Sequence, residues 1–528
     1  MSELLHQLIE SSARRHPSLP ALGFKTQTLD YRSLWNEVQQ AAQAFVGLGL
    51  KRGERLGIYL EKRLETVIAL FAATAAGCVV VPINPILKPR QVGYIMRDCN
   101  VRVLVTSKPR AEDLVEEIAG SPDLACVVLV DGSDLGTHEG RASVVDWPSA
   151  MAAPSRGAPS RVIDTDMAAI LYTSGSTGNP KGVVLSHRNM VAGAKSVSQY
   201  LENSPEDRIL SVLPLSFDAG LSQLTTGFAV GAKVVLLNYL LPRDVVRACA
   251  QEEITGMTGV PPLWIQLAEL DWPPATRSMR YFANTGGHMP RATLDRLRAA
   301  MPQAKPYLMY GLTEAFRSTY LDPAEVDRRP DSIGKAIPNA EILVVRPDGQ
   351  LCDADEPGEL VHRGALVGMG YWNDPERTAQ RYRPAPGQPA GLCLPEIAVW
   401  SGDVVRRDAD GFLYFVGRRD EMIKTSGYRV SPTEVEEVVY SSGLVGAAAA
   451  LGIPHERLGQ GIALVVTPPV GSRLDEAALM AECRRAMPQY MVPLRIIERG
   501  DLPRNPNGKI DRKLLAGEYA DLFQEESA

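Results

Sequence analysis

The residues with the clearest chemical signature form a loop rich in glycine and hydroxyl groups at positions 173–182, with the sequence TSGSTGNPKG. Glycines let backbone N–H groups approach an oxyanion closely, because no Cβ atom blocks the way. Hydroxyl groups and one lysine add donors that suit phosphate oxygens. Strand-like sequences flank the loop on both sides. We therefore predict a loop that binds a nucleotide triphosphate through Thr173, Ser174, Gly175, Ser176, Thr177, Gly178 and Lys181.

This loop differs from the common P-loop. That pattern places a second glycine directly before the lysine, whereas Pro180 occupies this position here, and Val183 rather than serine or threonine follows Gly182. A flexible linker rich in serine and glycine is the simplest alternative. The ordered Pro-Lys-Gly sequence and the strand-like flanks argue against a linker.

The loop resembles the phosphate-binding loop of the adenylate-forming superfamily, which contains acyl-CoA synthetases, peptide-synthetase adenylation domains and luciferases. Five further segments resemble motifs of that superfamily in the same order, so the resemblance spans nearly the whole chain. These segments are Thr285-Gly286-Gly287, YGLTE at 310–314, Ser401-Gly402-Asp403, GRRDEMIK at 417–424, and NPNGKID at 505–511. The resemblance implies ATP and Mg²⁺ as the nucleotide and its metal.

The resemblance also implies roles in the nucleotide site. Tyr310 would offer an aromatic face to adenine, Thr313 a hydroxyl to phosphate, and Glu314 a carboxylate to Mg²⁺, a metal that prefers oxygen ligands. Asp403 would accept hydrogen bonds from both ribose hydroxyls, and Arg418 would contact the ribose. The remaining members of the implied site are Gly286, Gly287 and Gly311.

Lys509 is the implied catalytic lysine, assisted by Thr313 and Glu314. A carboxylate must attack the α-phosphate while pyrophosphate leaves, and both reactants are anions. Lys509 would neutralise the carboxylate and bridge it to the α-phosphate. The attacking carboxylate is already ionised near pH 7, so the reaction requires no general base. Lys181 would then support the leaving phosphates.

A second half-reaction, also implied by the resemblance, transfers the acyl group to a thiol. The small C-terminal domain would rotate about Asp420, which serves as the hinge. Rotation would bring Lys424, Gly427 and Tyr428 to the site, where Gly427 lines a tunnel for a pantetheine arm. The thiol would belong to CoA or to the phosphopantetheine of a carrier protein.

The segment Leu213–Asp218 contains the main departure from ordinary acyl-CoA synthetases, which typically have a histidine here. Phe217 and Asp218 instead resemble the pair in amino-acid-activating domains, whose aspartate binds the substrate ammonium. Capping of the following helix is the alternative role for Asp218. Arg317 could bind a second acidic group on the substrate, or it could simply pair with Asp218. The implied pocket comprises Phe217, Asp218, Ala219, Ser222, Gly259, Ala283, Thr285, Met309 and Arg317.

Three functions fit this pattern. The leading interpretation is a ligase that activates a small carboxylic acid, with amino acids as candidates, and passes it to a carrier-protein or CoA thiol. A conventional acyl-CoA synthetase acting on a small non-amino acid with free CoA is the alternative. A nucleotide-binding regulatory protein is the third. The chain also resembles the acyl-CoA ligases associated with exosortase A systems, which favours a separate carrier protein as partner.

Composition agrees with this class. The chain has 528 residues and a net charge of −6, so no basic excess favours nucleic acid. Its seven cysteines are scattered without a C-x-x-C pair, which favours a reducing cytoplasm. The longest apolar run, at 66–81, is too short for a bilayer and is divided by Gly77, so we expect no membrane span.

The elements that must position these residues alternate between helical and strand patterns over the first 400 residues. This alternation predicts a layered α/β fold. Short apolar strands are expected at 102–106, 126–130 and 233–237. A charged stretch follows Gly417, and a helix start is predicted at Ser431-Pro432. We therefore expect a large N-terminal adenylation domain, 1–419, and a small mobile α+β domain, 420–528, that carries the catalytic lysine.

Overall fold

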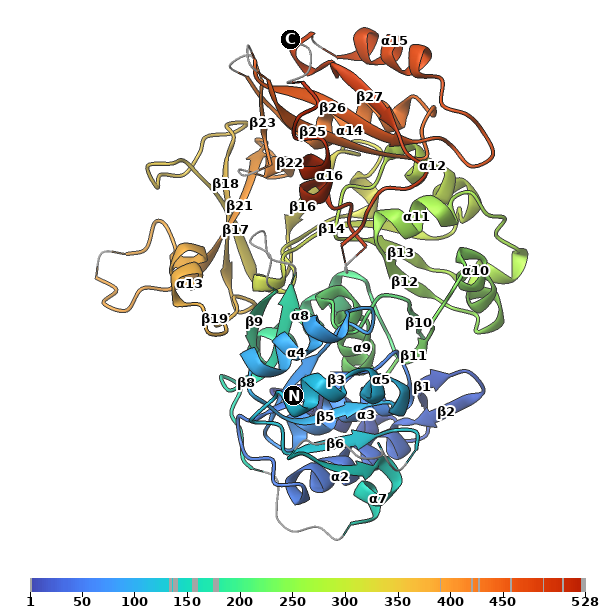
Figure 1. The fold of residues 1–528 in the computed structure, drawn as a ribbon, viewed down its shortest axis with the longest axis vertical. Helices are drawn as coiled ribbons and strands as arrows, with labels where there is room; N and C mark the ends of the chain where they lie inside the picture. Colours follow the sequence, from blue (N-terminus) through green and yellow to red (C-terminus); the bar gives the residue numbers. More distant parts are fainter. Residues whose placement is uncertain are drawn as a thin grey trace.

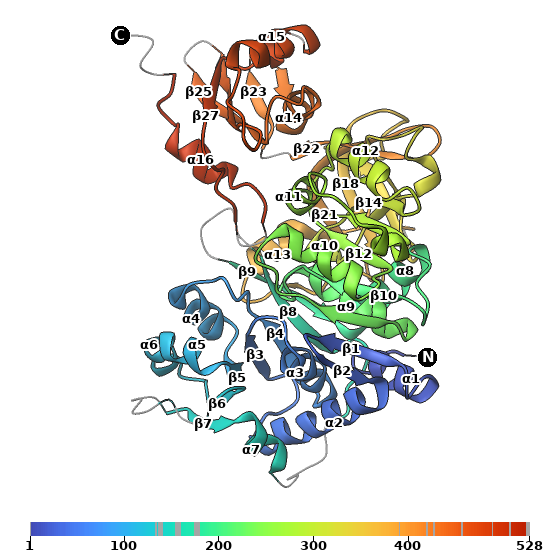
Figure 2. The same cartoon turned by 90° about the vertical axis from the view of Figure 1, so that its right-hand side faces the viewer.

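Two domains of unequal size make up the fold, with the small C-terminal domain at the top of Figure 1 and Figure 2. The computed structural model describes residues 2–132, 135, 141–153, 160–173, 180–389, 391–418, 421–425, 428–455, 458–487, 489–505 and 508–523. The predicted mixed α/β class, with a large and a small domain, is confirmed. The predicted boundary at 420 falls outside the described residues and stays a prediction.

The largest sheet runs through the middle of the large domain. Its strands β11, β10, β12, β13 and β14 are parallel neighbours, so their carboxyl ends meet at one edge. In spatial order the sheet contains β17 (Ala340–Val345), β18 (Gly358–Gly364), β21 (Ile397–Arg407), β22 (Leu413–Arg418), β16 (Ser332–Ala336), β15 (Thr319–Leu321), β14 (Lys305–Tyr310), β13 (Tyr281–Asn284), β12 (Gly256–Gly259), β10 (Arg208–Ser211), β11 (Lys233–Leu236), β1 (Pro20–Phe24) and β2 (Gln27–Asp30), and β20 (Tyr382–Pro384) pairs with β21.

The second sheet lies below it in Figure 1. A hairpin of two antiparallel strands at one side of this sheet flanks the predicted phosphate loop. In spatial order the sheet contains β19 (Gly370–Tyr371), β9 (Lys181–Ser186), β8 (Met167–Thr173), β4 (Val79–Pro82), β3 (Arg55–Tyr59), β5 (Val101–Thr106), β6 (Cys126–Leu129) and β7 (Ser143–Asp146).

The small domain has its own sheet and its own buried apolar clusters, formed by residues from Ile423 onward. Helix α14 (Pro432–Ser441) begins with Ser431 as N-cap residue, as predicted. Helices α15 (Glu476–Ala486) and α16 (Arg512–Glu518) complete this domain. Its strands are β24 (Tyr428–Val430), β23 (Ile423–Thr425), β26 (Gly459–Thr467), β25 (Ala447–His455) and β27 (Arg495–Glu498).

Helices cover the two large sheets. The main ones are α1 (Gln7–Arg15), α2 (Tyr31–Gly47), α3 (Leu64–Ala75), α4 (Pro89–Asp98), α8 (His187–Tyr200), α9 (Asp218–Val230), α10 (Pro242–Gln251), α11 (Pro261–Leu267), α12 (Arg291–Ala300) and α13 (Pro375–Arg381). Shorter helices are α5 (Lys108–Asp113), α6 (Val115–Ala119) and α7 (Trp147–Ala152).

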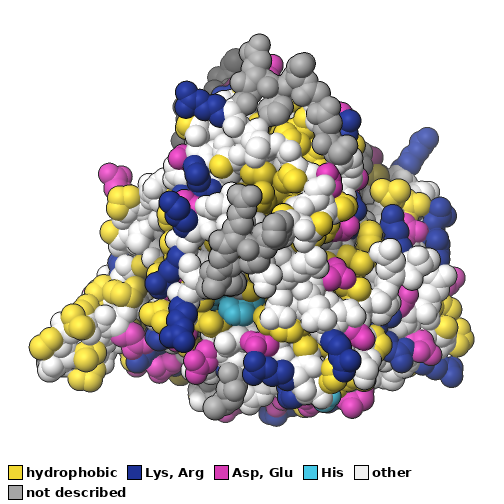
Figure 3. Space-filling model, turned by 90° about the horizontal axis from the view of Figure 1, so that it is seen from below, with side chains coloured by type: hydrophobic (Ala, Val, Ile, Leu, Met, Phe, Trp, Pro, Cys, Tyr) yellow, Lys and Arg dark blue, Asp and Glu magenta, His cyan; other side chains and the backbone are white. Residues whose placement is uncertain are grey.

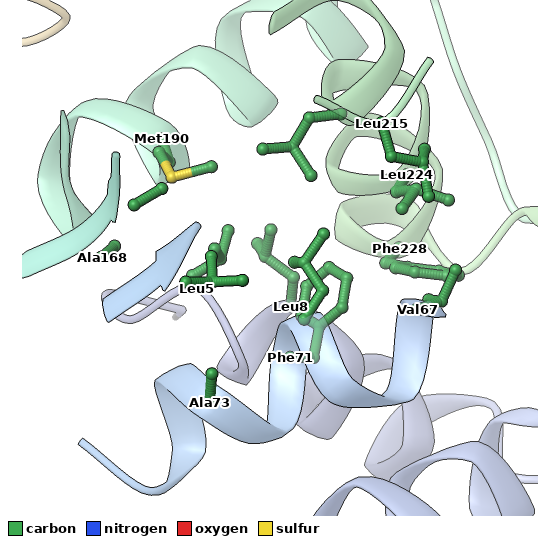
Figure 4. Packing of buried hydrophobic residues seen from close by; sticks show 14 of the residues in the cluster. Leu5, Leu8, Val67, Phe71, Ala73, Ala168, Met190, Leu215, Leu224 and Phe228 are labelled. Carbon is green, nitrogen blue, oxygen red and sulfur yellow. The ribbon is translucent and has the colours of Figure 1, made fainter. Parts of the chain in front are cut away.

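The largest apolar cluster joins the two big sheets. Leu5 and Leu8, at the N-terminal end, are buried between α3 and α9, where they meet Phe71 and Phe228 (Figure 4). Burial of such side chains stabilises the fold by about 2 kcal/mol each. Helix α1 and the residues just before it are therefore a docked part of the core.

The apolar run at 66–81 forms a buried helix and a buried strand, α3 and β4. Gly77 divides them with a φ of +84°, a conformation that residues with a Cβ atom rarely adopt. Among the described residues, no helix is long and apolar enough to cross a membrane. Lys and Arg side chains lie interspersed with Asp and Glu across the face shown in Figure 3.

Candidate active site

A cleft of about 2110 Å³ lies between the two domains, at the carboxyl ends of the parallel strands of the large sheet. In open parallel sheets, ligands bind at this edge because the loops that follow the strands converge there. The cleft is lined by Thr173 and Lys181 from the hairpin, Asp218 from α9, Tyr310 from β14 and Lys509 from the small domain. The structure thus brings together residues that the sequence places far apart.

The side chains of Tyr310, Asp403 and Arg418 form a connected group. The Tyr310 hydroxyl donates to one Asp403 carboxylate oxygen over 2.5 Å, and the Arg418 Nε donates to the other over 2.9 Å. Burial, followed by the nearby Asp403 charge, raises the pKa of Tyr310 well above its ordinary value, so the hydroxyl remains a donor. This arrangement places an aromatic ring beside a carboxylate that can accept hydrogen bonds from the hydroxyl groups of a ribose.

Glu314 sits at the centre of a second group, in a short 3-10 helix over Thr313–Ala315. Its carboxylate accepts from Lys181 Nζ over 3.0 Å and from the Tyr371 hydroxyl over 2.5 Å. Burial alone would raise the pKa of Glu314, but the positive charges of Lys181 and Arg381 lower it to about 2. Glu314 is therefore an ionised carboxylate in a buried position.

The residues around Glu314 fit a magnesium ion bound together with substrate phosphates. The Thr173 hydroxyl lines the cleft and is buried without a hydrogen-bond partner among the described residues, so it can bind a ligand oxygen or metal-bound water. No group of three metal-ligating side chains occurs among the described residues. Magnesium typically uses one or two carboxylates and completes its shell with phosphates and waters.

Lys509 reaches into the same cleft from the turn before α16. The turn is held by backbone hydrogen bonds between Asn505 and the residues at 508 and 509, and Gly508 has a φ of +80°. The surrounding protein displaces water from the ammonium group and so lowers the pKa of Lys509. The positive charge of Arg418 lowers it further, while Asp218 and Asp403 oppose both effects. Because the carboxylates of Asp218 and Asp403 both act on the Lys509 ammonium, this group lies between the acid side and the nucleotide side of the cleft.

On the acid side, Asp218 and Arg317 form a buried ion pair, with 2.8 Å between Oδ2 and Nη1. Asp218 is the first residue of α9 and follows the N-cap residue Phe217, which makes no side-chain capping bond, while the backbone N–H of Ala219 in the first turn interacts with the Asp218 carboxylate. Burial raises the pKa of Asp218 above its ordinary value, and the charge of Arg317 offsets only part of this rise. The structure thus shows the direct pairing that the sequence left as one alternative for Arg317.

Arg317 is aimed at Asp218 by a tight backbone turn. Phe316 has φ +58° and ψ −46°, and the N–H of Arg317 donates to the carbonyl of Ala315 over 2.6 Å. A γ-turn of this kind is rare and strained for a residue with a side chain. Phe316 is fully buried beside Gly193 of α8, where a Cβ atom would lie 2.5 Å from its ring. Packing therefore holds the strained turn in place.

The loop before α9 is held just as closely. A Cβ atom on Gly220 would lie 1.9 Å from the carbonyl oxygen of Pro214, so the loop rests directly on the helix. The buried Lys62 donates from Nζ to the carbonyls of Val212 and Leu213 over 2.9 and 3.3 Å. These contacts fix the backbone that precedes Asp218.

The other predicted pocket residues divide into two groups. Phe217, Thr285 and Met309 line the cleft with Asp218, and so do the predicted nucleotide residues Gly286, Gly287, Gly311 and Thr313. Ala219, Ser222, Gly259, Ala283 and Arg317 do not line it. Gly259 and Ala283 instead contact Trp264, whose Nε1 donates to the Ala283 carbonyl over 3.2 Å.

Several predicted residues lie outside the described residues. They are Ser174, Gly175, Ser176, Thr177 and Gly178 of the phosphate loop, the hinge residue Asp420, and Gly427. The side chains of Lys424 and Tyr428 are not described either, although their backbones form part of β23 and β24.

Three residues of the site gave no sequence signal. Tyr371 and Arg381 surround Glu314, and His288 forms a contact between the domains. Each acts through a partner more than 50 positions away. Local patterns cannot reveal such pairs.

Comparisons with known proteins agree with this geometry. The family model described as AMP-binding enzyme matches residues 9–372, and the model described as AMP-binding enzyme C-terminal domain matches 434–509. Tyrocidine synthase 3 of Brevibacillus parabrevis is 28% identical over 97% of this chain, which spans only 8% of that protein.

Relatives of about the same length as this chain match equally well. A long-chain-fatty-acid–CoA ligase of Salmonella typhimurium is 29% identical, with 97% of this chain and 94% of the ligase covered. The crystal structure of the anthranilate CoA ligase AuaEII with anthranoyl-AMP superposes with a TM-score of 0.87 at 25% identity, covering 98% of this chain and 97% of that one. The resemblance seen in the motifs is confirmed, and the chain belongs to the AMP-binding enzyme family.

Proposed function

We propose that this protein is an ATP-dependent, AMP-forming acid–thiol ligase. The supporting observation is that Lys509 of the small domain enters the cleft between Asp218 on one side and the Tyr310–Asp403–Arg418 group on the other. A single cation between an acid pocket and a nucleotide pocket suits the joining of two anions.

In the first half-reaction, a substrate carboxylate oxygen bonds to the α-phosphorus of ATP, and the bond from that phosphorus to the bridging oxygen of pyrophosphate breaks. Lys509 offsets the charges of the carboxylate and the α-phosphate as they meet. Asp403 and Tyr310 hold the nucleoside, while Thr173 and Lys181 hold phosphate oxygens. Glu314 would hold Mg²⁺, which supplies charge neutralisation to the phosphates when bound. No proton transfer is required.

In the second half-reaction, a pantetheine sulfur attacks the carbonyl carbon of the adenylate, and the bond between that carbon and the AMP oxygen breaks. The thiol proton leaves to solvent, and AMP departs. We assign the hinge to Asp420 between domains 1–419 and 420–528, and the thiol path to Lys424, Gly427 and Tyr428. These assignments rest on the sequence resemblance.

The charge balance of the pocket favours an acid without an ammonium group. Asp218 is already neutralised by Arg317 at 2.8 Å, so an amino-acid ammonium would compete with a fixed guanidinium for one carboxylate. A small carboxylic acid with an uncharged polar substituent meets no such competition. We therefore favour the non-amino acid over the amino acid, which remains the second candidate because Asp218 lines the cleft.

The pocket is also short. Behind Met309, the buried ring of Tyr200 stacks on the partly buried ring of Tyr320 with centroids 4.3 Å apart, and the Tyr200 hydroxyl lies 3.0 Å from the Met309 sulfur. This layer separates the cleft from a hollow of about 870 Å³ on the other side, which Tyr200 and Tyr320 also line. A long acyl chain would have to displace the layer.

We infer that the thiol acceptor is a separate carrier protein or CoA, in the cytoplasm. All seven cysteines are free thiols, and six are buried, which fits a reducing compartment. A carrier protein acting in trans follows from the sequence resemblance, and its phosphopantetheine arm would enter by the proposed thiol path.

Pyrophosphate exchange into ATP, measured with a panel of small carboxylic acids and the corresponding amino acids, tests the proposal. We expect exchange with short non-amino acids and none with long-chain fatty acids. Exchange with amino acids alone would reverse our choice of substrate. An absence of exchange with every acid would refute the ligase function and favour a nucleotide-binding regulatory protein.

A further inference from the structure

One ion pair links the two domains beside the cleft. His288 Nε2 of the large domain lies 2.7 Å from Glu437 Oε2 on α14 of the small domain. The other Glu437 oxygen accepts from the backbone N–H of Arg291, at the start of α12, over 3.4 Å. Helices α12 and α14 are neighbours in Figure 1 and Figure 2. Glu437 therefore holds one short segment of the large domain at two points.

Lys509 also lies beside that segment. His288 follows Gly286 by two positions, and a Cβ atom on Gly286 would lie 3.7 Å from Lys509 Cε. Gly286 has a φ of +78°, and the carbonyl of Gly287 accepts from Asn284 Nδ2 over 2.8 Å, so the segment is held in one conformation. The ion pair and the lysine thus meet the same fixed loop.

Within the small domain, α14 is tied to the segment that carries Lys509. Glu436 accepts three hydrogen bonds from Arg512, at distances of 3.1, 2.8 and 2.6 Å. Glu436 is buried and also accepts from the backbone N–H of Ala450 over 2.8 Å. The two neighbouring glutamates of α14 therefore have different partners: Glu437 pairs with the large domain, and Glu436 pairs with the segment that carries Lys509.

We propose that His288 and Glu437 form a latch that positions Lys509 in the cleft for adenylate formation. The inference rests on the proposed function, because the latch must open before the small domain turns for thioester formation. We treat His288 and Glu437 as positioning residues, because the contact that carries the argument is the one they make with each other across the domain boundary. Their pairing sets the balance between the two half-reactions.

The latch depends on protonation of His288. Partial removal of water from the His288 side chain, which stays 31% exposed, lowers the pKa of His288, but the Glu437 carboxylate and the nearby charges of Asp331 and Glu436 raise it above the ordinary value. Arg291, on α12, faces Glu437 and supports its ionised form. Because the pKa of His288 is higher in the latched arrangement than when the domains separate, latch stability is fully present at low pH. It is lost as pH rises through the raised pKa.

The experiment compares His288→Gln, Glu437→Gln and the double variant with the wild-type protein. Adenylate formation is followed by pyrophosphate exchange, and thioester formation is followed separately from a preformed acyl-adenylate. We expect each single variant to lower the exchange rate by about 3- to 10-fold and to leave thioester formation unchanged or faster. The double variant should be no slower than either single variant.

The pH profile adds a second readout. The exchange rate of the wild-type protein should fall as pH rises through the His288 titration, and this step should be absent from both variants. Asp327→Asn is the matched control, because it breaks an ion pair with Arg298 of α12 that does not cross the domain boundary. It should leave both half-reactions unchanged.

A distance measurement separates the latch from the ligase function. Cys393 is the exposed cysteine of the chain, so a fluorophore there can be paired with one at Ser472→Cys in the small domain. Energy transfer should change in His288→Gln relative to wild type without any substrate. Unchanged transfer and unchanged half-reactions would overturn the latch and leave the ligase function standing. A wild-type protein without exchange activity would overturn the ligase function, and energy transfer would still decide whether the latch exists.

Discussion

Arg317 Nη1 lies 2.8 Å from Asp218 Oδ2, although the two residues are 99 positions apart and both are buried. The pair therefore brings a balanced charge to the acid side of the cleft rather than a lone carboxylate. A buried ion pair contributes little net stability, but loss of one partner leaves an uncompensated charge. We therefore expect both the stability of the fold and the choice of substrate to depend on this contact.

Arg317→Met should destabilise the protein by about 3–5 kcal/mol, because it leaves Asp218 buried without a cation. The double variant Asp218→Asn/Arg317→Met should recover part of that loss. Urea denaturation of the wild-type protein, Asp218→Asn, Arg317→Met and the double variant measures the coupling. Arg298→Ala, which breaks an exposed ion pair, is the control and should leave the midpoint unchanged. A loss of stability in the double variant equal to the sum of the two single-variant losses would show that the pair is not coupled.

Lys509→Ala should lower the rate of adenylate formation by about 10²- to 10³-fold, because the charge between the two anions is lost. Thioester formation from a preformed adenylate should continue. Pyrophosphate exchange and a thioester assay measure the two steps separately. Lys305→Ala, which removes an exposed lysine paired with Glu202, should leave both steps unchanged. Full exchange activity in Lys509→Ala would remove Lys509 from its proposed role.

Glu314 makes the stability of the protein depend on pH in the acid range. Its pKa is lowered from 4.5 to about 2, so its ionised form stabilises the fold above pH 4.5, and this contribution is lost as pH falls toward 2. The shift corresponds to about 3 kcal/mol. Glu314→Gln should therefore be less stable than wild type at pH 6, and the difference should shrink at pH 3. Urea midpoints at both pH values provide the measurement, and a constant difference would contradict this assignment.

Gly193→Ala should destabilise the protein by about 1–3 kcal/mol, because the added methyl group overlaps the buried ring of Phe316. The displaced ring should disturb the γ-turn that aims Arg317, so pyrophosphate exchange should fall as well. Gly47→Ala is a matched control on helix α2, where a Cβ atom meets nothing within 4 Å. It should keep full activity and wild-type stability or slightly better. Thermal unfolding and exchange assays compare the two.

Much of the fold could be predicted from local sequence. The strand patterns at 102–106, 126–130 and 233–237 correspond to β5, β6 and β11. Periodicity identifies such elements because it reflects which face of each element is buried. The spatial order of the strands could not be predicted this way, because it depends on pairings between distant segments.

In the candidate site, too, residues of local motifs could be predicted, whereas contacts between distant residues could not. Tyr310, Glu314 and Asp403 belong to short motifs, and the structure places all of them in the cleft. The partner of Arg317 could not be chosen from sequence, since an internal carboxylate and a substrate carboxylate are chemically equivalent partners for a guanidinium. His288 and Glu437 carry no motif, and their pairing becomes visible only when the domains are placed together.

The contact between Gly220 and the Pro214 carbonyl limits how this pocket can diversify. Any side chain at position 220 would strike backbone, which cannot rotate away as a side chain can. Laboratory evolution toward new acids should therefore leave this glycine untouched and accumulate changes in the wall residues Val260, Ile265 and Met309, which line the same cleft. The position of helix α9 is therefore fixed by backbone contact, and new substrate preferences can arise from substitutions in the opposite wall of the cleft.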